Sequence, residues 1–407
     1  MRKKIVVLTA TRAEYGLLRN IISELDQTEE IHVEVAVTGA HLSPECGLTY
    51  REIEKDGIHI AKKIEILLSS STAVAVSKSM GLALAGFAEY FEESRPDALL
   101  ALGDRYETLA VCCAAMNARI PIFHLYGGET TEGAVDEAIR HAITKMSYLH
   151  FTSTEEYRRR VIQLGEDPER VFRVGAVGVE NALRRKKLGK EELAESVGMD
   201  LKVPFGVVTF HPVTLEGEAE AQCGEVMKAI ERLKGFQFII TGANADCGGG
   251  DVNRLFSEFA KQHENVYFTL SLGMERYLSA LSYAAFVLGN SSSGLIEAPS
   301  FHIPTINVGN RQKGRIKADT VVDCGTDARD IVGAVEYALS QTFLKRIRNA
   351  VNPYGDGNTS RKVAGIVKEQ LLYKEISLQK KFYDIQEMNY EKCGHYSRPE
   401  RFEGAKR

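Results

Sequence analysis

The chain has 407 residues, a length sufficient for two domains of ordinary size. Hydrophobic residues make up 44% and charged residues 26%, and the net charge of −4 offers no general basic surface for nucleic acid or an anionic membrane. None of the seven cysteines forms a C-x-x-C pair, and no apolar stretch reaches membrane-spanning length. We therefore expect a cytoplasmic globular protein with reduced cysteines, no membrane partner and no nucleic-acid partner.

The first part of the chain alternates short apolar runs with helical patterns. Predicted strands cover 4–10, 32–38, 58–66, 97–102, the apolar run that begins at 120, 148–153 and 171–174. Predicted helices lie between them, over about 17–25, 47–56, 72–93, 107–117 and 154–164, with Ser71 or Thr72 capping the third and Thr154 the last. This alternation is typical of a doubly wound parallel sheet, in which ligands bind beyond the carboxyl ends of the strands.

The same alternation begins again after Pro204. Predicted strands cover 205–210, 236–241, 266–270, 286–289, 305–308 and 321–324, and predicted helices cover 216–234, 295–300, 327–340 and 359–372. We expect two Rossmann-like α/β domains with a cleft between them, over 1–175 and 176–358, and a hinge within 175–189. Residues 359–407 are expected to form a C-terminal helix and, from 373, a peripheral tail of mixed charge.

The polar residues that follow Gly127-Gly128 are the first candidate site. A polar loop beginning at Glu129 leads into a helical pattern in which Asp136 and Arg140 share one face at i and i+4. Two carboxylates and an arginine are thus expected to converge just past a strand end. The alternative is an ordinary surface ion pair between Asp136 and Arg140, worth only a few tenths of a kcal/mol.

Two other strand ends in this half carry charged residues. Arg12 lies after the first strand, just before a helix, which suits a phosphate group, although the dinucleotide and P-loop fingerprints are absent. Asp104 follows the strand over 97–102. The alternatives are a solvated loop arginine and an aspartate that only caps the next helix.

The second half contains a candidate anion site in the sequence Asn290-Ser291-Ser292-Ser293-Gly294. Backbone N–H groups and hydroxyls between a strand and a helix can hold a diphosphate without net charge. Glu297, one turn later, suits the two hydroxyls of a ribose. His211, Arg311 and Arg315 also follow strand ends and can reach the same anion. A plain helix cap and a structural histidine are the alternatives for the serines and for His211.

Several motifs together resemble the hydrolysing UDP-N-acetylglucosamine 2-epimerases of bacterial sialic-acid-type pathways. They are T-x-T-R-A-E-Y-G (9–16), L-G-D-R-Y-E (102–107), G-G-E-T-T-E-G-A-V-D-E-A-I-R-H-A-I-T-K (127–145), F-H-P-V-T (210–214), G-N-S-S-S-G-L-I-E-A (289–298) and Y-G-D-G-N (354–358). The resemblance implies a glycosyltransferase-B-like fold whose C-terminal helix packs back on the first domain. It also implies homo-oligomers, a homodimer or a homotetramer.

The resemblance also implies the reaction and the residues. UDP would be eliminated from UDP-N-acetylglucosamine, and the glycal would be rehydrated to N-acetylmannosamine. The positions that match family carboxylates in catalysis are Asp104 and Asp136, with Arg140 organising the site; the UDP-binding positions are Arg12, His211, Ser291, Ser292 and Glu297. At position 126 relatives often carry a carboxylate or a histidine, whereas this chain has Tyr126, a poor base that can still donate a proton. This difference shifts the expected base to Asp104, Asp136 or Glu129, or marks another substrate such as the diacetamido-trideoxyhexose used toward legionaminic acid.

Two other functions are compatible with these residues. A glycosyltransferase of the same architecture would need an acceptor groove, and a non-catalytic sugar-nucleotide sensor would bind without turnover. The gathered carboxylates argue for the enzyme. No nicotinamide fingerprint and no clustered metal ligands occur, so we expect no cofactor and no metal.

Overall fold

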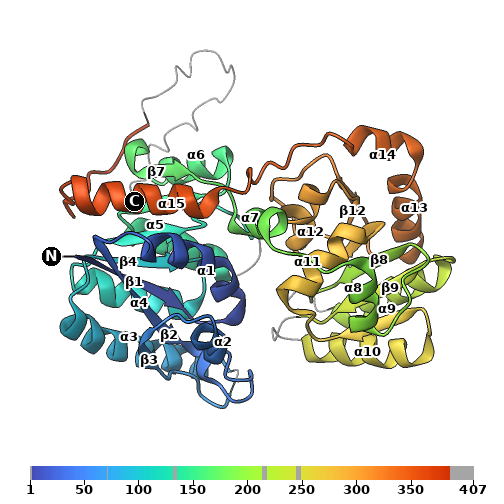
Figure 1. Ribbon diagram of the computed structural model, residues 1–407, viewed down its shortest axis with the longest axis horizontal. Coiled ribbons are helices and arrows are strands. Elements are labelled where there is room, and N and C mark those ends of the chain that lie inside the picture. The colour runs from blue at the N-terminus through green and yellow to red at the C-terminus, as the bar shows by residue number, and fades with distance from the viewer. Residues whose placement is uncertain (1, 71, 132–134, 213–217, 244–248, 386–407) are drawn as a thin grey trace, which may run out of the picture.

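The computed structural model describes residues 2–70, 72–131, 135–212, 218–243 and 249–385, and within them the chain forms two α/β halves that lie side by side (Figure 1). The first half contains a seven-stranded sheet in the order β3-β2-β1-β4-β5-β6-β7. Its strands are β1 (Lys3–Thr9), β2 (Ile31–Thr38), β3 (Ile60–Ile64), β4 (Ala98–Leu102), β5 (Ile122–Leu125), β6 (Leu149–Thr152) and β7 (Val171–Arg173). Every pairing between them is parallel.

Helices follow most of these strands and cover both faces of the sheet. They are α1 (Arg12–Asp26), α2 (Tyr50–Lys55), α3 (Ala73–Ser94), α4 (Tyr106–Asn117), α5 (Val135–Met146) and α6 (Glu155–Gln163), with short 3-10 turns at η1 (Gly39–Leu42) and η2 (Pro168–Arg170). Threonine side chains cap three of them, because Thr11, Thr72 and Thr154 each accept a hydrogen bond from a first-turn N–H. The alternative cap for α3, Ser71, lies outside the described residues.

The second half repeats the arrangement in a six-stranded parallel sheet with the order β10-β9-β8-β11-β12-β13. Its strands are β8 (Phe205–Thr209), β9 (Gln237–Thr241), β10 (Val266–Thr269), β11 (Phe286–Gly289), β12 (Thr305–Val308) and β13 (Val321–Cys324). Its helices are α8 (Lys190–Val197), α9 (Ala219–Arg232), α10 (Gly249–Gln262), α11 (Gly273–Tyr283), α12 (Ser293–Ile296), η3 (Ala298–Phe301), α13 (Ala328–Ala338) and α14 (Gln341–Ile347). The predicted doubly wound α/β architecture is confirmed in both halves.

Successive residues of β1 are buried on opposite faces of the sheet, so this strand contributes to two hydrophobic cores. Ile5 and Val7 are fully buried in the core that includes α1, and Val6 and Leu8 are buried in the core beneath α3 and α4. Side chains of successive strand residues point to opposite faces, so a central strand needs an unbroken apolar run. The carboxyl ends of the strands remain at the sheet edge, where the polar loops lie.

The segment predicted as a hinge contains the helix α7 (Val177–Arg184), which contacts α1 of the first half and η3 of the second. The last helix, α15 (Thr359–Tyr373), returns to the first half and packs along α1 (Figure 1). The domain boundaries and the hinge role remain predictions. No helix in the described parts of the chain is long and apolar enough to cross a membrane.

The segment 374–385, which we call the C-terminal strap, lies against the first half of the chain. Lys380 Nζ lies 2.5 Å from the Glu166 carboxylate and donates to the Ser147 carbonyl over 2.6 Å, and the Tyr383 N–H donates to the Gly165 carbonyl. These contacts could not be predicted from the sequence, because the strap forms no regular secondary structure and its apolar residues show no helix or strand periodicity. Residues 386–407 lie outside the described chain.

Candidate active site

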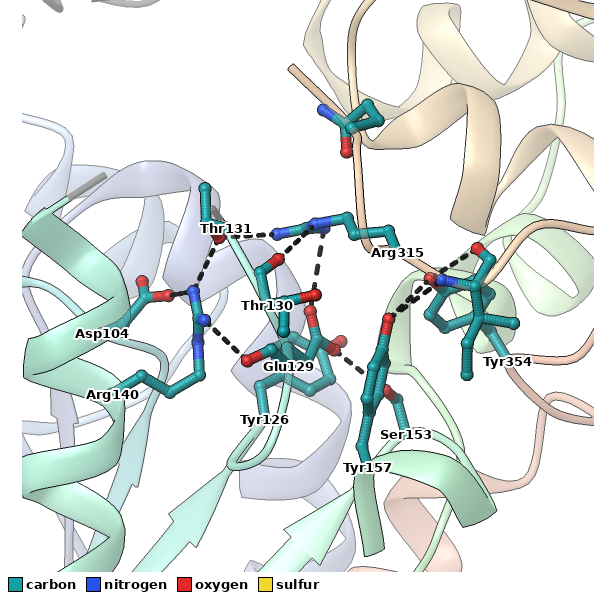
Figure 2. A network of polar contacts seen from close by, with 12 residues as sticks. Asp104, Tyr126, Glu129, Thr130, Thr131, Arg140, Ser153, Tyr157, Arg315 and Tyr354 are labelled. Atoms are coloured by element: carbon teal, nitrogen blue, oxygen red, sulfur yellow. Dashed lines mark hydrogen bonds and ion pairs between the residues drawn. The ribbon is translucent and has the colours of Figure 1, made fainter. Parts of the chain in front are cut away.

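The buried guanidinium of Arg140 organises the first half of the site (Figure 2). Its Nη1 donates to the Glu129 carbonyl over 2.8 Å and pairs with Glu137 Oε2 at 2.7 Å. Its Nη2 donates to Thr131 Oγ1 over 2.9 Å and to the carboxylate of Asp104. Burial lowers the pKa of Arg140, but the neighbouring carboxylates outweigh it, so the guanidinium stays charged.

This arrangement excludes the surface-ion-pair alternative, because the Arg140 side chain is only 2% exposed. Arg140 also has a carboxylate partner that was not predicted. Glu137, at i−3, pairs with Arg140, whereas Asp136 lies exposed in the same helical turn. Both spacings place a residue on the Arg140 face of a helix, so sequence periodicity alone could not choose between them.

Asp104 does not cap the helix that follows it. The residue at the N-cap of α4 is Arg105, and no side-chain cap hydrogen bond forms there. The Asp104 side chain is 27% exposed and faces Arg140 across the ends of β4 and β5. A partly exposed carboxylate held by a buried arginine is available to a ligand at this edge of the sheet.

The loop after β5 joins the two halves through Arg315. Glu129 accepts a 2.8 Å hydrogen bond from Ser153 Oγ, and its other carboxylate oxygen lies 3.7 Å from Arg315 Nη1. Arg315 Nε donates to the Thr130 carbonyl over 3.1 Å, and Thr130 Oγ1 donates to the Gly314 carbonyl over 3.1 Å (Figure 2). The buried Glu129 carboxylate therefore lies at the seam between the halves.

Tyr126 occupies a strained position at the end of β5. Its φ of 71° is a conformation that bulky residues rarely adopt, and such strain concentrates at functional sites. Its hydroxyl accepts a 2.9 Å hydrogen bond from the Val177 N–H. Burial, followed by the nearby charges of Glu129 and Glu297, raises the pKa of Tyr126 well above its usual range, so the phenol stays protonated.

A cavity of about 840 Å³ lies between the halves. Four of the residues predicted to bind UDP line it, namely Arg12, His211, Ser291 and Glu297. Ser292, Arg311 and Arg315 are not among its lining residues, and neither are Asp104, Tyr126, Glu129, Asp136 and Arg140. The structure thus gathers four of the seven predicted nucleotide residues around one cavity, whereas the predicted catalytic residues lie outside its lining.

Gly178 lines the cavity and lies close to one residue of each group. It follows Val177, whose N–H binds Tyr126, and a Cβ at position 178 would lie 2.2 Å from the Glu297 carboxylate oxygen. Only glycine permits this close approach between α7 and Glu297. Burial raises the pKa of Glu297 to about 7, against the effects of Ser293 and Arg315, so this carboxyl group titrates near neutrality.

Asn290 fixes the backbone of the cavity residue His211. Its side chain accepts from the His211 N–H over 2.7 Å and donates to the His211 carbonyl over 2.8 Å, which ties the end of β8 to the end of β11. The Asn290 carbonyl accepts from Arg311 Nη1 over 3.1 Å. Burial and the Arg311 charge lower the pKa of His211 to about 3, so this imidazole donates as a neutral group.

The loop 290–294, which we call the serine loop, leads into α12. Ser292 is the N-cap residue of α12, and its side chain makes no capping hydrogen bond. Ser293 Oγ accepts a 2.8 Å hydrogen bond from Tyr277, and Arg12 Nη2 donates to Ser271 Oγ over 2.6 Å across the cavity. The Tyr277 and Ser271 contacts were not predicted, because no local pattern marks a residue whose partner comes from a distant segment.

Two doubly wound parallel halves around an interdomain cavity define a glycosyltransferase-B-like protein. The family model described as UDP-N-acetylglucosamine 2-epimerase matches residues 23–368. The chain belongs to this family, whose known relatives include hydrolysing 2-epimerases of UDP-sugars.

Three relatives are similar over most of the chain. A polysialic acid biosynthesis protein P7 from Escherichia coli is 41% identical, with 95% of this chain and 98% of that protein covered. A hydrolysing GDP/UDP-N,N'-diacetylbacillosamine 2-epimerase from Campylobacter jejuni is 40% identical, with 84% and 89% covered. A hydrolysing UDP-N,N'-diacetylbacillosamine 2-epimerase from Legionella pneumophila is 36% identical, with 92% and 98% covered.

Solved structures support the fold. The crystal structure of a UDP-GlcNAc 2-epimerase from Neisseria meningitidis bound to UDP-GlcNAc aligns with a TM-score of 0.79 at 19% identity, with 90% of this chain and all of that chain covered. A putative UDP-N-acetylglucosamine 2-epimerase from Listeria monocytogenes aligns with a TM-score of 0.78 at 19% identity, with 92% and 98% covered. The predicted glycosyltransferase-B-like fold is confirmed.

Proposed function

We propose that this protein is a hydrolysing 2-epimerase that converts UDP-N-acetylglucosamine to N-acetylmannosamine and UDP. The observation that carries the proposal is that Arg140 binds both the Asp104 carboxylate and the Glu129 carbonyl, while Tyr126 at the same strand end binds Val177, the neighbour of the cavity-lining residue Gly178. A nucleotide in that cavity can present its sugar to the carboxylates. Neither a sensor nor a glycosyltransferase requires carboxylates at this position.

The proposed reaction has two steps. A base removes the proton on sugar C2 while the C1–O bond to UDP breaks, which leaves a C1–C2 double bond and free UDP. Water then adds its oxygen at C1, and a proton returns to C2 from the opposite face. The C2 proton is weakly acidic, so proton removal and leaving-group departure must be assisted together.

The acid–base groups we propose are Asp104, Glu129 and Asp136, and we propose that Tyr126 takes part as a hydrogen-bond donor that keeps its proton. Asp104 is the strongest candidate for the base, since it is partly exposed while Arg140 fixes its orientation. Tyr126 cannot act as the base near neutral pH, because its hydroxyl holds its proton. Arg140 contacts the protein and serves as a positioning residue.

The UDP leaving group gains negative charge as the bond breaks. We propose that Arg12 and the serine loop stabilise this charge, with His211 donating a neutral hydrogen bond. Glu297 is placed to accept from ribose hydroxyls. We propose that Arg311 and Arg315 support the UDP-binding residues without contacting UDP, since both already bind backbone carbonyls.

The test is to incubate the protein with UDP-N-acetylglucosamine in heavy water and to follow the products by NMR. We expect free N-acetylmannosamine carrying deuterium at C2, together with UDP. Accumulation of UDP-N-acetylmannosamine without free sugar contradicts the hydrolysing reaction. Binding without any turnover supports the sensor instead.

The variant Asp104→Asn separates catalysis from binding. It should abolish turnover while the UDP affinity stays within about tenfold, or ~1.4 kcal/mol, because Asp104 does not line the nucleotide cavity. Equal losses of turnover and UDP affinity would identify Asp104 as a structural residue.

A second candidate substrate is a UDP- or GDP-linked diacetamido sugar of the bacillosamine type. The 40% and 36% identity to two 2-epimerases of that name favours it, and so does the tyrosine at position 126. A panel of UDP- and GDP-linked acetamido sugars, compared by kcat/KM, distinguishes the two.

We also propose a homodimer or homotetramer, which light scattering after size-exclusion chromatography can test.

A further inference from the structure

Two buried histidines lie beneath α5 and have no assigned role in the proposed reaction. His124 on β5 and His150 on β6 are neighbours in the parallel register, and both side chains are fully buried. A buried imidazole is costly unless its polar nitrogens find partners. The partners of these two histidines therefore indicate what each one holds in place.

The hydrogen bond of His124 fixes its tautomer. Its Nε2 lies 2.7 Å from the Gly103 carbonyl oxygen, and because a carbonyl can only accept, Nε2 carries the proton. Nδ1 has no hydrogen-bond partner within the described chain. Burial lowers the pKa of His124 to about 4; Asp104 opposes this shift, while His150 and Arg140 add to it.

Gly103 is the residue on which this hydrogen bond acts. Its φ is 80°, a conformation that glycine adopts without strain but does not hold rigidly. The Gly103 N–H donates to the Leu125 carbonyl over 3.0 Å, and its carbonyl accepts from His124. The backbone N–H and the carbonyl of Gly103 are thus both held by residues of β5. Gly103 immediately precedes Asp104, so these two hydrogen bonds fix the backbone next to that carboxylate.

We propose that His124 is a positioning residue: its Nε2–H holds the Gly103 carbonyl and thereby keeps the Asp104 carboxylate directed at Arg140 and the sugar. The inference rests on the proposed function, since it matters to turnover only where Asp104 takes part in the reaction. A displacement of about 1 Å at a reacting group can cost roughly 100-fold in rate.

Two substitutions test this role. Gln can place an amide N–H near the position of Nε2, so His124→Gln should keep kcat within about fivefold of wild type, whereas His124→Leu should lower kcat by about 10- to 100-fold. KM and the UDP affinity should change by less than about threefold in both, because His124 does not line the nucleotide cavity.

The matched control is His263→Leu. His263 is half-buried in the second half, and its Nδ1 lies 2.9 Å from the Phe259 carbonyl, so this variant also removes a histidine–carbonyl hydrogen bond. It should leave kcat unchanged. Normal kcat in folded His124→Leu overturns the positioning role, even where its melting temperature falls. A wild type that turns over none of the nucleotide sugars contradicts the proposed function instead.

A measurement on the wild-type protein covers the case in which His124→Leu does not fold. Nitrogen NMR of histidine-labelled protein should show His124 as the neutral Nε2–H tautomer at pH 7 and still neutral at pH 5.5. The Nδ1–H tautomer, or protonation above pH 6, would overturn the hydrogen bond to Gly103 and with it the proposal.

Discussion

Glu297 is the cavity residue whose ionisation should most affect ligand binding. Its folded-state pKa of about 7 lies above the ordinary value of 4.5, because burial disfavours the charged form. Without ligand, this group therefore costs stability as the pH rises from 4.5 to about 7. A ligand hydroxyl donates more strongly to the carboxylate than to the neutral acid, so binding should favour the ionised form.

We predict that the UDP affinity of the wild type, relative to Glu297→Gln, rises about tenfold between pH 6 and pH 8, since the ionised fraction changes by about that factor around a pKa of about 7. Calorimetric titrations of both proteins at pH 6, 7 and 8 measure this ratio. Taking the ratio cancels the ionisation of the UDP phosphates. A ratio that does not vary with pH rules out a carboxylate contact to the ligand.

Arg12 contributes a full charge at the opposite wall of the cavity. Its guanidinium is exposed and donates to Ser271 Oγ, so it can turn to a phosphate at little cost. We predict that Arg12→Ala weakens UDP binding by about 10- to 100-fold, the usual effect of losing a charge-assisted hydrogen bond. Arg95→Ala, an exposed arginine on the C-cap of α3, is the control. Unchanged affinity in Arg12→Ala would make Arg12 an ordinary solvated residue.

At the residue scale, sequence reasoning could identify groups at strand ends but not their partners. Asp104 and Arg140 were predicted because parallel strands bring their carboxyl ends to one edge. The contact of Arg315 with Thr130 depends on how the second half sits against the first, and no local pattern encodes that. The contact of Glu137 with Arg140 was not predicted either, and the Thr131 N–H in the loop before the helix also donates to the Glu137 carboxylate.

At the element scale, the strands were predicted to within a few residues, because buried parallel strands are continuous apolar runs. Four helices of the second half were not anticipated, namely α8, α10, α11 and α14. A signal for α8 exists, since Leu193 and Val197 are buried at i and i+4. α14 spans only seven residues directly after α13, too short for a periodic pattern to stand out.

The C-terminal strap neutralises a buried carboxylate of the first half, a role that the sequence alone did not indicate. Glu166 is 1% exposed and binds three groups: Lys145 at 2.6 Å, His150 at 3.0 Å and Lys380 of the strap at 2.5 Å. Burial raises the pKa of Glu166, but the hydrogen bond from His150 and the two ammonium groups lower it to about 2. The strap thus supplies one of the charges that keep this carboxylate ionised.

We predict that Lys380→Met destabilises the protein by about 1–3 kcal/mol, since it leaves a buried carboxylate short of one partner. Lys381→Met, at an exposed neighbouring position, should change little. The folded-state pKa of Glu166 lies below the ordinary 4.5, so its stabilisation is complete above that pH and declines toward about 2. Urea unfolding should therefore show equal differences at pH 7 and 5 and a smaller one at pH 4. Equal stability of the two variants at pH 7 would leave the strap without an energetic role.

At the scale of the whole molecule, the two halves meet at α7 and at the contacts around Arg315. Arg315 reaches the first half by the hydrogen bond to the Thr130 carbonyl, and its Nη1 lies near Glu129 (Figure 2). Its side chain is 14% exposed and does not line the cavity. These contacts favour a role in aligning the halves, whereas the sequence favoured a role in binding the UDP anion.

The variant Arg315→Ala separates these roles. Loss of alignment should lower kcat/KM by about 10- to 100-fold while the UDP affinity stays within about threefold, because the nucleotide keeps its contacts in the second half. Lys317→Ala removes a nearby exposed ion pair to Asp323 and should leave both quantities unchanged. The radius of gyration from X-ray scattering should increase in ligand-free Arg315→Ala and return toward the wild-type value with UDP, since a ligand that binds between the halves favours the closed arrangement. A tenfold loss of UDP affinity with an unchanged radius of gyration would instead assign Arg315 to the anion.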